Sequence, residues 1–136
     1  MWVYRAGGWN AERSGALVTA DATTSSDGVA LFSLGALAPG DYDLQLKGTH
    51  TLSRLAAVVS LGAGTNVVQV GTLSEGDVNG DDVVGDADFQ FVAGRFGLRS
   101  GESGFDTAAD LTGDGLIDVA DLSLLAGNYG TRGPVR

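Results

Sequence analysis

The chain has 136 residues, of which 43% are hydrophobic and 18% charged, and its 22 glycines indicate a globular, turn-rich protein. Seventeen acidic and eight basic residues give a net charge of -9, the wrong sign for nucleic acid phosphates or an anionic membrane surface. The chain has no cysteine and a single histidine, which argues against an enzyme and a thiolate metal site. No apolar run approaches the ~18 residues that cross a bilayer, which argues against a membrane span.

Residues 1–74 contain short apolar or β-branched runs separated by turn residues. Pro39-Gly40 predicts a turn before Tyr42, Leu44 and Leu46, which alternate toward one face. Six or seven strands at this spacing predict a first domain, 1–74, that is a small antiparallel β-sandwich. The expected strands are 2–5, 16–20, 29–34, 42–47, 52–61 and 66–73.

Turn and core residues of this half follow the order Ser26-Asp27-Gly28, Phe32, Leu37, Pro39-Gly40, Tyr42 and Gly48. This order resembles the transthyretin-like or carboxypeptidase regulatory-like β-sandwich. The resemblance implies a noncatalytic spacer or accessory domain of a secreted or surface protein. Trp2, Tyr4 and Trp9 are candidates for a carbohydrate-binding face, although aromatic residues near a sandwich terminus more often belong to a core or an interface.

The acidic residues concentrate in the second half. Residues 1–74 have five acids and four bases, a net charge of -1, whereas residues 75–136 have twelve acids and four bases, a net charge of -8. A shift of 33 residues superimposes 77–88 on 110–121, so a loop and the segment after it are duplicated. The apolar pattern repeats too: Phe89, Val92, Ala93, Gly94, Phe96 and Gly97 fall on Leu122, Leu125, Ala126, Gly127, Tyr129 and Gly130.

Each copy places oxygen side chains at loop positions 1, 3, 5 and 12, the spacing with which an EF-hand loop surrounds one calcium ion. Two calcium ions are therefore expected. The ligands predicted in the first loop are Asp77, Asn79, Asp81, the carbonyl of Val83 and Asp88. Those predicted in the second loop are Asp110, Thr112, Asp114, the carbonyl of Leu116, Asp118 through a water, and Asp121.

The loops depart from the usual sequence at three positions, and the weaker ligand at position 3 of the second loop predicts that the two sites differ in affinity. Asp82 stands at position 6, where a glycine normally allows a left-handed turn, so the first loop is strained. Aspartate replaces the longer glutamate at position 12 of both loops, and Thr112 is a weaker ligand than Asn79. Val84 and Ile117, at position 8, are expected to pair the two loops back to back.

After each loop the apolar residues follow helical spacing, and we expect the helices to end at Gly97 and Gly130. No helix is predicted before either loop, so these are half EF-hands. A segment of this size without disulfides needs an additional source of stability, which a bound metal supplies.

Two tandem loop-helix repeats beginning Gly76-Asp77-Val78-Asn79-Gly80-Asp81 resemble the dockerin domain, the module by which secreted proteins bind cohesin domains. The resemblance covers about 75–133 and implies a small all-α second domain, 75–136, that binds calcium and a cohesin-like protein. In dockerins of cellulose-degrading assemblies, loop positions 10 and 11 are often Ser-Thr and contact the cohesin. Here the candidate partner-binding residues are Asp86, Ala87, Val119, Ala120 and the neighbouring Ser123, so a different recognition code is expected.

The leading hypothesis is a noncatalytic, extracellular, calcium-dependent docking module carried on a β-sandwich, within a C-terminal piece of a secreted protein. A second hypothesis is a self-assembling subunit of a surface fibre or layer that uses residues 2–5 as an edge or donated strand. A third hypothesis gives the sandwich a carbohydrate-binding role.

Overall fold

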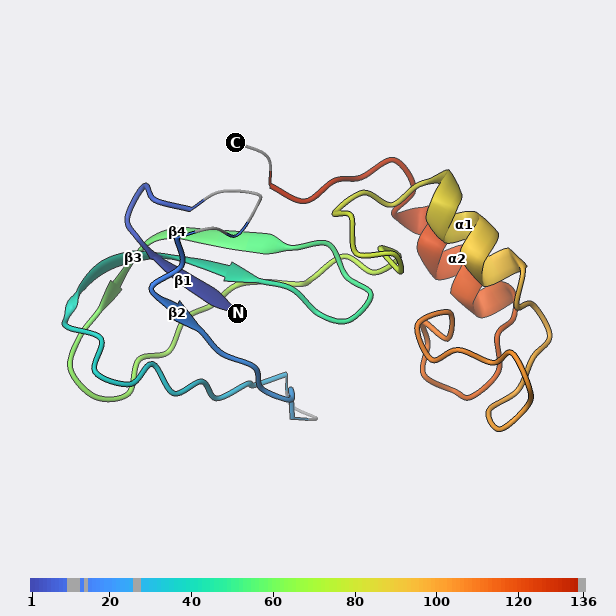
Figure 1. Ribbon diagram of the computed structural model, residues 1–136, viewed down its shortest axis with the longest axis horizontal. Helices are drawn as coiled ribbons and strands as arrows, with labels where there is room; N and C mark the ends of the chain where they lie inside the picture. Colours follow the sequence, from blue (N-terminus) through green and yellow to red (C-terminus); the bar gives the residue numbers. More distant parts are fainter. Residues whose placement is uncertain (10–12, 14, 26–27, 135–136) are drawn as a thin grey trace. The chain divides into compact units, whose positions relative to one another are not determined.

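The computed structural model describes residues 1–9, 13, 15–25 and 28–134 (Figure 1). Its contacts divide the chain into two compact units. The first unit contains Met1–Leu46, Arg54–Gly71 and Pro134, and the second contains Lys47–Ser53 and Thr72–Gly133. The segment 47–53, which connects two strands of the first unit in the sequence, therefore packs as part of the second unit.

The first unit is built on a four-stranded antiparallel sheet with the strand order β2-β1-β3-β4 (Figure 1). Tyr42, Leu44 and Leu46 all contribute to the apolar cluster on this sheet, as their alternation predicts. The strands are β1 (Trp2–Arg5), β2 (Val18–Thr19), β3 (Gly40–Leu46) and β4 (Arg54–Leu61).

Two of the predicted strands are wrong, because residues 29–34 and 66–73 join no strand ladder in the described part of the chain. Phe32 and Leu34 nevertheless pack against the sheet's apolar cluster, whereas Leu31, the residue before Phe32, is 81% exposed. The apolar alternation was thus interpreted correctly for side-chain burial and incorrectly for backbone pairing. The predicted antiparallel sheet is observed, and the described residues form no second sheet of the expected sandwich. Ser26 and Asp27 lie outside the described residues.

The position of β1 contradicts the idea of a donated strand, since β1 pairs with both β2 and β3 and is an inner strand. The aromatic residues near it do not form an exposed face either. Tyr4 and Trp9 are buried, and the guanidinium of Arg13 lies 4.7 Å from the centre of the half-buried Trp2 ring. These residues fit the core or interface interpretation.

The second unit contains α1 (Asp86–Ala93) and α2 (Val119–Gly127), which lie side by side (Figure 1). No helix in the described ranges has the length and apolar character needed to span a membrane. Both helices end earlier than predicted: Gly97 and Gly130, with φ of 86° and 80°, lie in turns after the helices. The buried core consists of Leu52, Val84, Val92, Ala109, Leu111, Ile117 and Leu125.

Candidate calcium-binding loops

The first loop (residues 77–88) and the second loop (residues 110–121) have the same backbone turns. Position 4 is left-handed in both, with φ of 81° at Gly80 and 73° at Gly113. Position 6 is left-handed too, with φ of 64° at Asp82 and 84° at Gly115. Asp82 thus adopts the glycine-type conformation that its position predicts, at a cost of about 1 kcal/mol.

The position 1 aspartates organise both turns by accepting hydrogen bonds from backbone amides. Asp77 accepts from Gly80 N through Oδ1 (2.8 Å) and from Asp82 N through Oδ2 (2.9 Å). Asp110 accepts from the equivalent amides, Gly113 N and Gly115 N, each at 2.8 Å. Both aspartates are buried, so each loop is wrapped around its first carboxylate.

The position 12 aspartates close the loops from the first turns of the helices. Asp88 accepts from Val78 N and Gly85 N, both at 2.9 Å, and Asp121 accepts from Thr112 N at 2.9 Å and Asp118 N at 2.8 Å. Both side chains are almost completely buried. Each therefore links the start of its loop to the start of its helix, which is the connection that an EF-hand ligand at position 12 makes.

The remaining predicted ligands lie near the surface. Asn79 donates through Nδ2 to Asp81 Oδ2 (3.1 Å) in the first loop. In the second loop, Thr112 Oγ1 donates to Asp121 Oδ1 (3.1 Å), which brings positions 3 and 12 together, and Asp114 accepts from Leu116 N (2.9 Å).

Two predicted ligands also have local backbone roles. Asp118 accepts from Ala120 N (2.7 Å) and so caps the N-terminus of α2. Val83 N donates to Asp81 Oδ1 (2.9 Å), and Leu116 N, at the equivalent position of the second loop, donates to Asp114 Oδ1 (2.9 Å).

The position 8 residues meet in one core, and their backbone bonds go to other segments. Val84 N donates to Thr131 O (3.0 Å) after α2, and Ile117 N donates to Leu98 O (3.0 Å) after α1. Each loop is therefore bonded to the segment that follows the other copy's helix. The Val84 and Ile117 side chains are fully buried in one shared core.

The second loop has the chemistry that a calcium ion requires. Asp110 and Asp121 are buried carboxylates whose hydrogen bonds come from amides and a hydroxyl, and no ion pair among the described residues includes them. Buried carboxylates without a cation are unfavourable, and a divalent ion bound by oxygen would balance them. Among the described residues, no group of three or more acidic or histidine side chains is arranged so that it could hold a metal ion. The two ligand sets therefore stay predictions.

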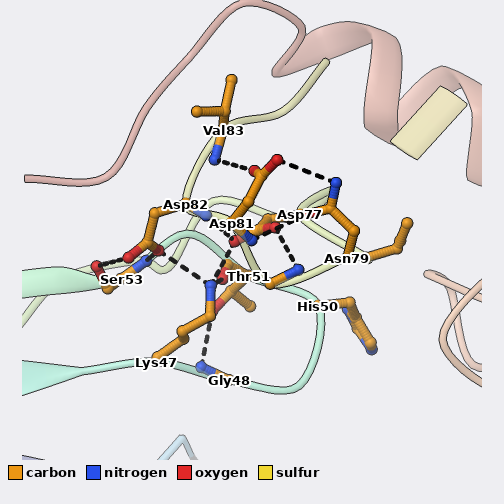
Figure 2. Close-up of polar contacts among 12 residues, drawn as sticks. Lys47, Gly48, His50, Thr51, Ser53, Asp77, Asn79, Asp81, Asp82 and Val83 are labelled. Carbon is orange, nitrogen blue, oxygen red and sulfur yellow. Dashed lines mark hydrogen bonds and ion pairs between the residues drawn. The ribbon is translucent and has the colours of Figure 1, made fainter. Parts of the chain in front are cut away.

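The first loop is different because the side chain of Lys47 reaches it (Figure 2). Lys47 Nζ contacts Asp77 Oδ2 and also donates to Asp82 Oδ1 (3.0 Å) and Thr51 O (2.8 Å). From the sequence, Lys47 is predicted only as the last residue of the strand 42–47. The available clue was that it is the only lysine in an acidic chain.

Ser53 completes the surroundings of Asp82. Its amide donates to Oδ1 (2.7 Å) and its hydroxyl to Oδ2 (2.8 Å). Burial raises the pKa of Asp82, but the bonds from Ser53 and Lys47 outweigh it, so the pKa of this carboxyl lies below its ordinary value. Asp82 is therefore held as a carboxylate at neutral pH.

His50 also belongs to the second unit, and it is paired. Its Nδ1 lies 2.5 Å from Glu75 Oε2. The hydrogen bond to Glu75 raises the pKa of His50, burial opposes this, and the charges of Glu75 and Asp110 raise it further. This charge pair joins the segment 47–53 to the residues that lead into the first loop.

The candidate partner-binding residues are exposed at the starts of the two helices. Val119 is 66% exposed, and Ser123 Oγ donates to the carbonyl of Val119 (2.6 Å). Asp86 Oδ1 accepts a hydrogen bond from the hydroxyl of Tyr129, which follows α2. Other large hydrophobic side chains exposed in this unit are Phe89, Phe96 and Tyr129.

Comparisons with known proteins agree with this geometry. Residues 75–128 match the family model of the dockerin type I domain. Two solved structures of type II cohesin-X-dockerin complexes from Acetivibrio cellulolyticus, a C-terminal and an N-terminal interface mutant, are similar with TM-scores of 0.70 and 0.62. The matched chain in each structure is 22% identical to this chain, and each similarity covers 86% of this chain and 78% of the matched chain. No curated protein gives a significant match to the chain.

Proposed function

We propose that residues 75–133 form a noncatalytic docking domain of the dockerin type that binds a cohesin-like protein in a calcium-dependent manner. The observation that carries the proposal is the coincidence of the dockerin type I match, at 75–128, with two loops that share their turns and buried carboxylates. Half EF-hands of this kind bind calcium through loop oxygens and use their helices for contact with other proteins.

The proposed complement is two calcium ions, one in each loop, with the ligand sets predicted from the sequence. Support comes from equivalent hydrogen bonds from backbone amides in the two loops. Asp77 and Asp110 accept matching bonds at position 1, and Asp88 and Asp121 accept matching bonds at position 12. A domain whose partner binding depends on calcium works best where the ion is abundant, so we propose that this domain lies outside the cell or on its surface.

The proposed docking surface consists of the exposed starts of α1 and α2. Val119 and Ala120 offer a small apolar surface on α2, whereas Asp86 places a carboxylate at the equivalent point of α1. Apolar side chains that stay exposed next to one another on a small domain mark protein interfaces. The unlike chemistry of the two copies favours one orientation of the partner over two interchangeable ones. The sheet-bearing first unit is proposed as the carrier of this domain.

A panel of recombinant cohesin domains, immobilised and titrated with this chain, tests the proposal. We expect at least one cohesin to retain the chain in calcium and to release it in a calcium chelator. The Val119→Asp variant, which still contains every predicted ligand, is the matched control for binding through this surface. Retention that is equally strong in the chelator would refute calcium dependence, and failure of every cohesin to retain the chain would refute the partner class.

A further inference from the structure

The first loop already contains a positive charge of the chain's own. The Lys47 side chain is 10% exposed, and its ammonium contacts two carboxylates, those of Asp77 and Asp82, and the carbonyl of Thr51 (Figure 2). An ammonium has three N–H donors, so these three acceptors use all of them. Lys47 is therefore fully bonded inside the loop and is not a solvated surface lysine.

The position of Lys47 is set by an ordered segment. Leu52 N donates to Ser74 O (2.8 Å), and Gly76 N donates to His50 O (2.9 Å), so the segment 47–53 is paired with the residues just before the first loop. The turn is tight, because a Cβ at Gly48 would lie 3.0 Å from the side chain of Thr51. Leu52 is buried in the core of the unit. The ammonium is thus delivered by packed structure.

The residue at position 6 explains why only the first loop holds an ammonium. Asp82 adds a carboxylate beside the position 1 carboxylate of Asp77, and Lys47 bridges the two. The second loop has Gly115 at position 6, and no ion pair among the described residues includes its position 1 carboxylate, Asp110. Asp82, which departs from the usual loop sequence, and Lys47, which bonds it, therefore belong to one structural feature of the first loop.

We propose that Lys47 is the resident cation of the first loop, so that this loop stays ordered without calcium and binds calcium more weakly than the second loop, with displacement of the ammonium. The inference rests on the proposed calcium binding of both loops. Its physical basis is that Lys47 already uses an oxygen of Asp77, the predicted position 1 ligand. Calcium and the ammonium compete for that oxygen, and two like charges a few ångströms apart repel.

Calorimetric titration with calcium tests the competition. The wild type should show a tight step and a weaker step, and Lys47→Met, which removes the ammonium and keeps an unbranched side chain one atom shorter, should strengthen the weaker step at least about ten-fold. Arg5→Met removes one positive charge at an exposed site of the first unit and should leave both steps unchanged. Asp81→Ala should weaken the weaker step and Asp114→Ala the tight step, which assigns each step to a loop.

Because Lys47 is the chain's only lysine, labelling with ¹³C- and ¹⁵N-lysine gives a single Nζ signal in the NMR spectrum. The measurement is made on the wild type, so it does not depend on whether a variant folds. We expect this signal to move during the weaker step only. Two steps of equal affinity that Lys47→Met leaves unchanged, or a lysine signal that moves in the tight step, would overturn the inference while the proposed function stands. Absence of calcium uptake by both the wild type and Lys47→Met would instead overturn the proposed calcium binding.

Discussion

The two loops of the second unit share a backbone and differ in how their negative charge is balanced. In the first loop the buried Asp77 contacts an internal ammonium, whereas within the described part of the chain the hydrogen bonds to Asp110 in the second loop come from amides and a hydroxyl. One substitution within the loop, Asp82 in place of glycine, accompanies this difference. A duplicated motif can therefore keep its geometry while one copy acquires a different source of stability.

Removal of calcium should have the largest effect and should act mainly on the second loop. Calcium at 100 times its dissociation constant stabilises the folded state by about 2.7 kcal/mol, and chelation removes this contribution. Hydrogen exchange measured by mass spectrometry should show greater loss of protection at 110–121 than at 77–88, with the strands of the first unit still protected. Equal loss in both loops would contradict the difference in charge balance.

The starts of the two helices should contribute unequally to partner binding. Val119→Asp places an unpaired charge in a desolvated contact and should weaken partner affinity by about 2–5 kcal/mol. Asp86→Val removes a carboxylate that bonds Tyr129 and should cost less than about 1 kcal/mol. Affinities measured in saturating calcium decide the matter, and a larger loss from Asp86→Val would show that α1 leads the docking.

Within the second loop the ligands should rank by charge and burial. Asp121→Ala deletes a buried carboxylate and should lower calcium affinity about ten-fold to a hundred-fold, whereas Thr112→Ala deletes a neutral hydroxyl and should lower it less than about ten-fold. Asp88→Ala in the first loop serves as the control, because it should leave the tight step of the titration in place. Equal losses for Asp121→Ala and Thr112→Ala would show that this ranking is wrong.

Asp82→Gly converts the first loop to the second loop's sequence at position 6. Glycine relieves about 1 kcal/mol of left-handed strain, but the variant loses the bonds of Asp82 to Lys47 and Ser53, each of about 1.5–3 kcal/mol. The lost bonds outweigh the relieved strain, so we expect lower stability in chelator by urea unfolding. A more stable variant would mean that these bonds contribute little.

The pair of His50 and Glu75 should give the smallest effect. The pKa of His50 is raised in the folded state, so its contribution is complete below its ordinary pKa of 6.5 and is lost as the pH rises through the raised value. The two side chains are 24% and 30% exposed, which limits the change to below about 1 kcal/mol. Urea unfolding in saturating calcium at pH 6 and pH 8 should show this dependence in the wild type and not in His50→Gln.

Short-range features of the site follow directly from the sequence. The spacing of Asp110 and Asp121 places each carboxylate within reach of amides three to nine residues away, and the loop turns at positions 4 and 6 depend on local backbone geometry. Such contacts need no knowledge of the rest of the chain. The duplicated turns, the buried carboxylates and the left-handed Asp82 were predictable for this reason.

Tertiary structure alone decided the features that join distant residues. Lys47 reaches Asp77 and Asp82 across 30 and 35 positions of sequence, and Val84 bonds a segment beyond the other copy's helix. The segment 29–34 alternates as a strand does, yet it packs Phe32 and Leu34 against the apolar cluster without joining the sheet. Periodicity reports which side chains are buried, whereas backbone partners and charge partners depend on which segments the folded chain brings together.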